Sequence, residues 1–294
     1  MAVQNSLVKK GSQRLGITAY LTQDAVKNQI NSVIGGKDGQ RFISAIVSAV
    51  NNNPTLQECT NQSILSGALL GESLKLSPSP QLGQYYLVPF NDKDKGKVAQ
   101  FQLGYKGYIQ LAIRSGQYKK LNVLAIKNGE LEYFDPLNED IKISLMVDSW
   151  DEREEAETIG YYAMFELCNG FRKAIYWSKK QMESHAVKYS PGYKRDLEKN
   201  TKWTFWSKDF DGMAYKTMLR QLISKWGVMS IDMQMAFDSD MAAIREDLTP
   251  EYVDNDDSAD VIDMEEQEKA AVKAEPVQKE TKTNGVAAAL FGSK

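Results

Sequence analysis

The chain has 294 residues, of which 42% are hydrophobic and 26% are charged, as is typical of a soluble globular protein. It contains no run of about 18 apolar residues, so no membrane-spanning helix is expected. The formal net charge of −3 hides a segregation, because residues 1–245 carry 31 basic and 26 acidic side chains whereas residues 246–294 carry 5 and 13.

The first 80 residues predict a polar arm followed by helices. Residues 1–40 are polar and are interpreted as a loosely ordered arm containing one helix. Helices are expected at 22–34, 41–52 and 61–75. In the last of these, Ser63, Gly67 and Gly71 recur at every fourth position. Because such a stripe of small residues lets another element approach closely, we interpret it as a packing surface.

The middle of the chain predicts antiparallel hairpins around one helix. Hairpins are expected at 84–103, at 119–134 with Asn128-Gly129 as a type I′ turn, and at 158–177 around Asn169-Gly170. A helix is expected at 105–116, with Gly116 as its C-terminal stop. Its apolar face consists of Tyr105, Ile109, Ala112 and Ile113. A strand at 141–147 leads into an acidic loop, residues 148–157.

Helices return towards the C-terminus. Ser178 and Gln181 form a capping box for a helix at 179–189, and further helices are expected at 202–226 and 231–245. The SPGYKRD segment between them is expected to be a basic loop. This order of elements predicts an α+β fold. We divide the chain into an N-terminal arm (1–40), a core (41–246) and an acidic, disordered tail (247–294).

Residues that carry enzyme chemistry are scarce. His185 is the sole histidine, and without a Cys-x-x-Cys pair a zinc site is not expected. Cys59 and Cys168 are too few for a disulfide framework, and nothing beside either indicates an activated thiol. The sequence has no G-x-x-x-x-G-K-[ST] phosphate-binding loop. We therefore expect no catalytic residue, no metal site and no required cofactor. The small number of cysteines favours a reducing cytoplasm as the location of the protein.

Two basic segments flank an acidic one. Residues 93–127 carry 8 basic and 1 acidic side chains, residues 169–226 carry 13 and 5, and residues 130–157 between them carry 2 and 11. Basic clusters that include aromatic residues favour nucleic acid as a partner; ordinary solvated faces are the alternative. Residues 104–107 (GYKG) match the GxxG pattern that clamps a nucleotide backbone, at a point where a strand ends and a helix begins.

Three stretches together resemble the RecT family of phage and prophage single-strand DNA annealing recombinases. The first comprises FISAIVSAV, SILSGALLGESLKLSP and QYYLVPF. The second, FQLGYKGYIQLAIRSGQ (101–117), is similar to the family's most recognisable segment. The third, WTFWSKDFDGMAYKTMLRQL (203–222), is similar to a tryptophan-containing helix with the pattern M-x-x-K-T-x-x-R-x-L. The resemblance covers about residues 40–245, and it fails after the third stretch, where Gly227-Val228-Met229 replaces a frequent proline.

The resemblance implies an ATP-independent protein that binds single-stranded DNA and anneals complementary strands in homologous recombination. It implies a homo-oligomer, either a ring or a helical filament, that holds single strands and annealed duplex in a basic groove. A phage 5′→3′ exonuclease and a host single-strand binding protein are the implied protein partners, inside the bacterial host cell. The implied fold is a Rad52-like annealing core.

An annealing protein must neutralise phosphates while leaving base edges free to pair. The candidate DNA-binding residues are therefore one tyrosine and the cations of both basic clusters: Tyr105, Lys106, Arg114, Lys119, Lys120, Arg172, Lys173, Lys188, Lys194, Arg195, Lys202, Lys216 and Arg220. Tyr105 either stacks on a base or packs in the core. Lys216 and Arg220 are expected to face outward as a basic stripe; in the alternative, Arg220 pairs with a buried carboxylate.

Other functions stay open at the level of sequence. The alternatives are a passive single-strand coat that does not anneal, a structural phage protein such as a scaffold, and a Mg²⁺-dependent nuclease. For the oligomer we expect contacts from residues 1–60 and from the acidic loop 148–157, which would meet a neighbour's basic surface. The tail either docks a host or phage partner through Leu290 and Phe291 or competes with DNA for the basic groove.

Overall fold

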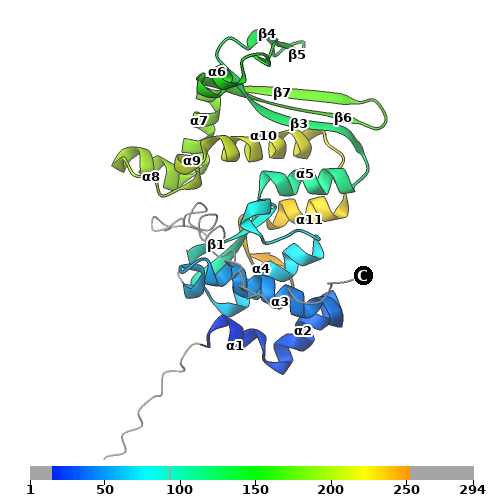
Figure 1. Ribbon diagram of the computed structural model, residues 1–294, viewed down its shortest axis with the longest axis vertical. Coiled ribbons are helices and arrows are strands. Elements are labelled where there is room, and N and C mark those ends of the chain that lie inside the picture. The colour runs from blue at the N-terminus through cyan, green and yellow to red at the C-terminus, as the bar shows by residue number, and fades with distance from the viewer. Residues whose placement is uncertain (1–14, 93, 252–294) are drawn as a thin grey trace, which may run out of the picture.

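The computed structural model describes residues 15–92 and 94–251 and shows two lobes stacked along one long axis (Figure 1). In chain order the elements are α1 (Ile17–Leu21), α2 (Asp24–Ile34), α3 (Gly36–Asn51), η1 (Leu56–Glu58), α4 (Asn61–Ser73), η2 (Pro80–Leu82), β1 (Tyr85–Asp92), β2 (Gly96–Leu103), α5 (Tyr105–Arg114), β3 (Tyr118–Lys127), β4 (Leu131–Asp135), β5 (Asp140–Ile143), α6 (Trp150–Glu155), β6 (Thr158–Leu167), β7 (Arg172–Ser178), α7 (Lys179–Tyr189), α8 (Pro191–Lys199), α9 (Phe205–Lys208), α10 (Phe210–Trp226), α11 (Ile231–Ser239), β8 (Ala242–Ile244) and β9 (Pro250–Glu251). All sheets are antiparallel, so the α+β class is confirmed.

The first lobe packs α1–α5 and α11 with a sheet of order β1-β2-β8-β9. The small residues of α4 are the reason that its hairpin lies so close. A Cβ at Gly67 would lie 2.7 Å from Leu87, and one at Gly71 would lie 2.3 Å from the Tyr85 ring. At Ser63 the Oγ accepts a 2.8 Å hydrogen bond from the Ala99 amide. The expected packing role of this stripe is confirmed.

The N-terminal helices belong to the core of the first lobe. Ile17 and Leu21 of α1 are buried in one cluster with Val26 and Ile30 of α2 and with residues of α3 and α4. The described part of the N-terminal segment is therefore packed against the lobe that follows it.

The second lobe is built on the sheet β3-β6-β7. The expected hairpin at 119–134 is wrong. Its turn is present, with Gly129 at φ 91°, but β3 pairs with β6 while β4 pairs with β5. The long apolar strand β6 buries most of its side chains and forms a ladder with β3 from Tyr118 to Lys127. The five-residue β4, whose side chains are half-buried or exposed, offers β3 a smaller apolar surface.

The helical region departs from expectation in where its helices begin and end. SPGYKRD is helical, because the Ser190 side chain caps α8 and Pro191 occupies its first turn. The helix expected at 202–226 is divided at Asp209, whose side chain caps α10 through the Gly212 amide. The helix expected at 231–245 ends at Ser239, and the chain then forms the strand β8.

Other expectations are confirmed or corrected locally. The Ser178–Gln181 capping box is present, and β1–β2 and β6–β7 form the expected hairpins. The acidic loop contains the short helix α6. On α5 the expected apolar face is rotated, because Tyr108 and Leu111 are buried whereas Ile113 is exposed.

Helix α10 connects the two lobes. Its Leu219 and Ile223 lie in the core of the first lobe, and its Met218 and Leu222 lie in the core of the second. Tyr118, Leu121 and Val123 of β3 also pack against both cores, so α10 and β3 together set the relative position of the lobes. Among the described residues, no helix combines the length and apolarity needed to cross a membrane. Of the disordered tail expected at 247–294, Pro250 and Glu251 instead form β9, which pairs with β8, and residues 252–294 lie outside the described residues.

Candidate nucleic-acid interface

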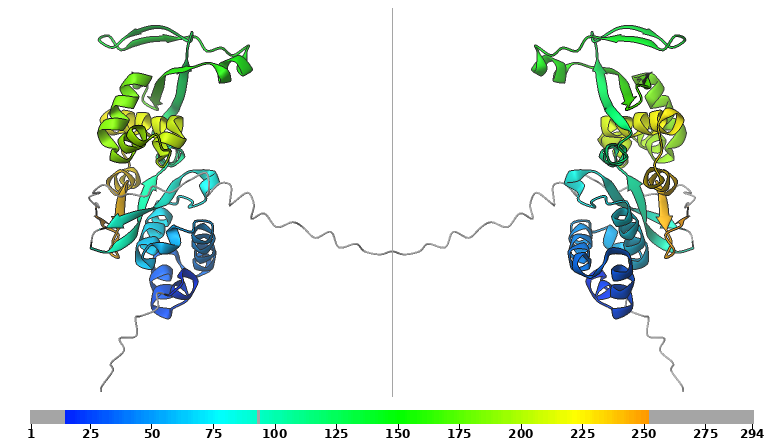
Figure 2. Two further views of the ribbon diagram at one scale, coloured as in Figure 1. Left: turned by 90° about the vertical axis from the view of Figure 1, so that its left-hand side faces the viewer. Right: turned by 90° about the vertical axis from the view of Figure 1, so that its right-hand side faces the viewer.

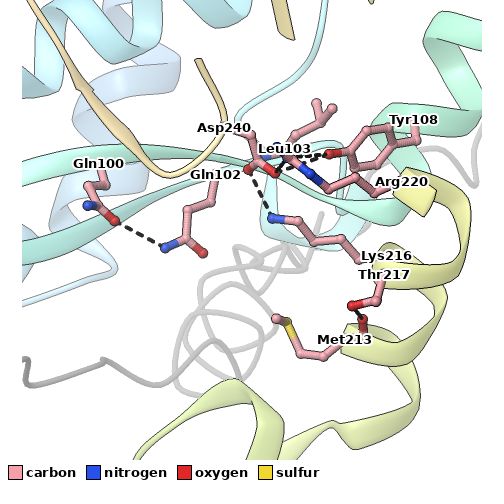
Figure 3. A network of polar contacts seen from close by, with 9 residues as sticks. All are labelled: Gln100, Gln102, Leu103, Tyr108, Met213, Lys216, Thr217, Arg220 and Asp240. Carbon is pink, nitrogen blue, oxygen red and sulfur yellow. Dashed lines mark hydrogen bonds and ion pairs between the residues drawn. The ribbon is translucent and has the colours of Figure 1, made fainter. Parts of the chain in front are cut away.

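Lys216 and Arg220, one turn apart on α10, converge on Asp240 (Figure 3). The Lys216 Nζ lies 2.9 Å from one oxygen of Asp240, and an Arg220 Nη lies 2.7 Å from the other. The Asp240 side chain is 0% exposed, that of Lys216 12% and that of Arg220 40%. The expected outward stripe is therefore wrong, and the alternative, in which Arg220 pairs with a buried carboxylate, is confirmed. We call these three residues the buried triad.

The buried triad ties α10 to three elements of the first lobe. The Leu103 amide at the end of β2 donates to Asp240 over 2.9 Å, and the Tyr108 hydroxyl of α5 donates over 3.1 Å. Burial and the nearby Asp240 raise the pKa of Tyr108, so this hydroxyl keeps its proton. Removing the carboxylate would leave two cations and two donors without their common acceptor. No local sequence pattern indicates this ion pair, since Asp240 follows Arg220 by 20 residues and caps the end of a different helix, α11.

A second group of two cations and one carboxylate lies on the surface. Lys119 Nζ is 2.5 Å from Glu166 of β6, and Lys120 Nζ is 3.3 Å from it. The two lysine side chains are 60% and 64% exposed. The hydrogen bond with Glu166 raises the pKa of Lys119 and lowers that of Glu166. The exposed Arg172 of β7 is the register partner of Glu166. We call Lys119, Lys120 and Glu166 the exposed triad.

Two other candidate cations have structural contacts. The Arg114 guanidinium donates to the carbonyls of Leu74 (2.7 Å) and Lys75 (3.2 Å) at the end of α4, where helix carbonyls lack partners. Lys173 is buried, pairs with Glu139 and places its Nζ 4.3 Å from the Trp226 ring centroid. Both side chains hold secondary-structure elements together.

The GYKG segment owes its glycines to packing within the chain. A Cβ at Gly104 would lie 2.1 Å from the Gly83 carbonyl oxygen, and one at Gly107 would lie 2.1 Å from that of Gln84. Tyr105 packs edge-to-face on Tyr215 with ring centroids 5.7 Å apart, as the packing alternative expected. These glycines let the first turn of α5 lie directly against residues 83 and 84.

This close approach creates an open groove beside Lys106. Its volume is about 290 Å³, and it is lined by Gln81, Leu82, Gln84, Lys106, Ile109 and Gln110. We call it the glutamine groove. It combines one exposed cation, several amide groups and apolar carbons, and its volume is near the lower limit of ligand sites, about 300 Å³. A second cavity, at the junction of the lobes, measures about 50 Å³ and has room for little more than water.

The remaining candidates lie around α7 and α8. Lys188, Lys194, Arg195 and Lys202 belong to residues 179–202, a segment that we call the basic face. Lys188 lies 5.1 Å from the Tyr189 ring centroid, and Lys194 is 3.9 Å from Glu198. Tyr189 and Trp203 are large exposed aromatic residues at its edge.

Asp196 fixes the loop that ends the basic face. This buried carboxylate accepts hydrogen bonds from the side chains of Thr201, Thr204 and Ser207 at 2.6–2.8 Å, and from backbone amides of the same loop. Burial alone would raise the pKa of Asp196, but the hydrogen bonds from Ser207, Thr201 and Thr204 outweigh it and lower the pKa to about 2. The sequence pattern could have predicted this cluster, since Thr201, Thr204 and Ser207 are short hydroxyl residues closely following an aspartate.

The candidate residues thus fall into separate groups rather than one groove. Lys106 lies in the glutamine groove, and four other candidates lie on the basic face. The exposed triad lies at one end of the β3-β6-β7 sheet, and the capping box of α7 lies at the other end. The buried triad lies between the lobes. Within the described residues, no group of three or more His, Cys, Asp or Glu side chains is arranged to hold a metal ion.

Comparison with known proteins shows which family this chain resembles in sequence. The model of the family described as "RecT family" matches residues 40–263. The "Uncharacterized protein YqaK" of Bacillus subtilis (strain 168) is 39% identical over 273 residues, which cover 90% of this chain and 87% of that protein. "Protein RecT" of Escherichia coli (strain K12) is 28% identical over 228 residues, covering 76% of this chain and 80% of that protein.

Proposed function

The chain belongs to the RecT family, whose members are DNA-binding, single-strand annealing proteins of recombination rather than classical enzymes, and we propose that it pairs complementary DNA strands without a nucleotide or metal cofactor. The family match over residues 40–263 carries this proposal. It includes both lobes from α3 onward and every candidate cation named above. A phage exonuclease and a host single-strand binding protein are the partners that we propose for it in recombination.

The glutamine groove is the first DNA contact that we propose. The family-like segment 101–117 supplies Lys106, Ile109 and Gln110 to it. In this proposal the Lys106 ammonium neutralises a phosphate, while amide and apolar groups accept a sugar or base without reading a sequence. Such a contact suits annealing, because the base-pairing edges need no protein partner.

The exposed triad is the second proposed contact. Glu166 neutralises one of the two lysines in the absence of DNA, and a surface ion pair of this kind is worth about 0.2–1 kcal/mol. A DNA phosphate therefore competes with Glu166 at little cost. Arg172, next to Glu166 in the strand register, adds a third cation to this part of the surface.

Annealing of two complementary labelled oligonucleotides, in EDTA and without nucleotide, tests the proposed function. We expect the protein to accelerate pairing well above the spontaneous rate, with no change when ATP and Mg²⁺ are added. A requirement for ATP hydrolysis would overturn the proposal. Strand binding without faster pairing would identify a passive coat, and strand cleavage in Mg²⁺ would identify a nuclease.

The DNA contact is tested with Lys106→Ala. We expect weaker binding of oligo(dT) and a salt slope lower by about 1, because one phosphate contact is lost. Lys27→Ala, which removes an exposed lysine from α2 of the first lobe, is the matched control and should leave both quantities unchanged. Equal effects of the two variants would show that the glutamine groove does not contact DNA.

A further inference from the structure

The glutamine groove contains polar side chains whose positions the fold fixes. A Cβ at Gly83, which has a φ of 58°, would lie 3.3 Å from the Lys106 Cδ, so the stem of this lysine lies across Gly83. The Gln84 Oε1 accepts a 2.7 Å hydrogen bond from the Ser77 amide, which leaves the NH2 group of Gln84 as a donor. One exposed ammonium and one oriented amide therefore line the same groove.

Further amides lie close to this ammonium. Lys106 and Gln110 are four residues apart on α5, so their side chains share one helix face and are separated by about 6 Å along the helix axis. Gln81 is exposed and Gln110 is half-buried, and within the described part of the chain neither side-chain amide is bonded to another group. Because an amide both donates and accepts hydrogen bonds, these side chains are suitable partners for a hydroxyl group.

A sugar hydroxyl is the chemical difference between the two kinds of nucleic acid. The 2′-hydroxyl of ribose donates and accepts hydrogen bonds, and a protein distinguishes RNA from DNA through it. A site restricted to DNA leaves this hydroxyl without a partner, which is costly. In the glutamine groove three of the six lining residues are glutamines, and the volume is about 290 Å³. A ribose in this groove would have amides within reach of its hydroxyl.

The rest of the proposed DNA surface does not favour one sugar over the other. The exposed triad would bind phosphates, which RNA and DNA share. The acidic segment 130–157, which contains β4, β5 and α6, projects at the end of the molecule opposite α1, whereas η2 and α5 form the groove in the first lobe (Figures 1 and 2). The six residues that line the groove include no acid, so nothing among them repels a polyanion.

We propose that the glutamine groove accepts ribose as well as deoxyribose, so that this chain binds single-stranded RNA and pairs it with complementary DNA. Lys106 contacts a phosphate, and the Gln110 amide contacts the 2′-hydroxyl of the same strand. The base-pairing edges need no protein partner, as in the pairing of two DNA strands. The inference rests on the proposed function and extends its substrate class from DNA to RNA.

Binding of oligo(U) and oligo(dU) to the full-length protein tests the groove, because these two strands differ only in the 2′-hydroxyl. We expect oligo(U) to bind at least as tightly as oligo(dU). Gln110→Leu removes the amide and keeps a side chain of similar size, so it should weaken oligo(U) binding by about twofold to tenfold, the contribution of one hydrogen bond, and leave oligo(dU) binding unchanged. Gln40→Leu, at an exposed glutamine of α3, is the matched control and should change neither.

Two binding results would overturn the proposal. The first is weaker binding of oligo(U) than of oligo(dU) by the unmodified protein. The second is a Gln110→Leu variant, folded by circular dichroism, that loses affinity for both strands equally or for neither. Either result would show that the Gln110 amide makes no contact with the 2′-hydroxyl.

Strand pairing in EDTA tests the activity. A labelled RNA strand with its complementary DNA strand is compared with the DNA–DNA pair of the same sequence, and we expect the protein to accelerate both. Acceleration of the DNA–DNA pair alone would overturn the extension to RNA and leave the proposed function standing. Failure of both pairs would refute the proposed function, whereas the oligo(U) measurements would still decide whether the groove accepts ribose.

Discussion

The buried triad and the exposed triad each combine two cations with one carboxylate, and they differ mainly in burial. In the buried triad Asp240 has no exposed side-chain surface, whereas in the exposed triad both lysines are more than half exposed. Losing one member of a buried ion pair costs about 3–5 kcal/mol, but exposed pairs contribute about 0.2–1 kcal/mol. Two cations and a carboxylate thus hold α10 against the first lobe in one place, whereas in the other place we propose that the exposed lysines bind phosphate.

Replacing the two carboxylates separately should give the largest contrast. Asp240→Ala leaves Lys216 and Arg220 without their buried partner, so we expect the free energy of unfolding to fall by about 3–5 kcal/mol. Glu166→Ala should cost no more than about 1 kcal/mol. Urea denaturation followed by tryptophan fluorescence measures both. Similar losses for the two variants would show that burial does not distinguish the triads.

Asp196 extends the comparison to a buried carboxylate whose partners are neutral. Asp196→Asn should lower stability at neutral pH by on the order of 2 kcal/mol, because the folded-state pKa of about 2 lies below the ordinary 3.8. A lowered pKa contributes stability above pH 4 that is lost as the pH falls towards 2. The difference between Asp196→Asn and the unmodified chain should therefore shrink between pH 4 and 2. A difference that stays constant over this range would assign the loss to packing instead of the carboxylate's charge.

Arg114 separates structural from DNA-binding cations on α5. Arg114→Ala removes hydrogen bonds to the carbonyls of Leu74 and Lys75, directly after α4, and we expect a loss of about 1 kcal/mol in stability. Oligo(dT) binding at moderate salt should change little, in contrast to Lys106→Ala on the same helix. Thermal unfolding and fluorescence anisotropy on both variants decide this. If Arg114→Ala weakened DNA binding without lowering stability, Arg114 would be a DNA-binding residue.

The smallest expected effect is that of removing the negative charge of Glu166. Glu166→Gln releases Lys119 and Lys120 from their surface partner, so single-stranded DNA should bind more tightly, by roughly twofold to fivefold at low salt. High salt should remove the gain, because exposed charges are screened. Unchanged or weaker binding at low salt would show that these lysines do not contact DNA.

The sequence predicted the structural features that depend on residues close together in the chain. Hairpins around Asp94–Lys97 and Asn169-Gly170, and the capping box at Ser178, depend on turn and cap chemistry within a few positions. The small-residue stripe of α4 was also predictable, since its spacing needs no knowledge of the partner. The partner of β3 was not, because β6 lies about 40 residues away and competes with the nearer β4 through its apolar surface.

The candidate site was predicted by residue type but not by environment. Cations at helical spacing without an acidic neighbour predicted an outward stripe at Lys216 and Arg220. The fold instead supplies Asp240 from the end of α11, a tertiary contact that no local pattern contains. The glutamine groove was unpredictable for the same reason. Gln81 lines it together with residues of α5 only because the first turn of that helix packs against residues 83 and 84.

The central claim is that the buried triad is structural and that DNA is bound by exposed cations. The most direct test is the salt dependence of oligo(dT) affinity, measured together with the melting temperature on folded Arg220→Ala and Lys120→Ala. We expect Arg220→Ala to lower the melting temperature by several degrees and keep its salt slope, and Lys120→Ala to keep its melting temperature and lose about 1 from the slope. The reverse pattern, with a stable Arg220→Ala that loses salt dependence, would contradict the account.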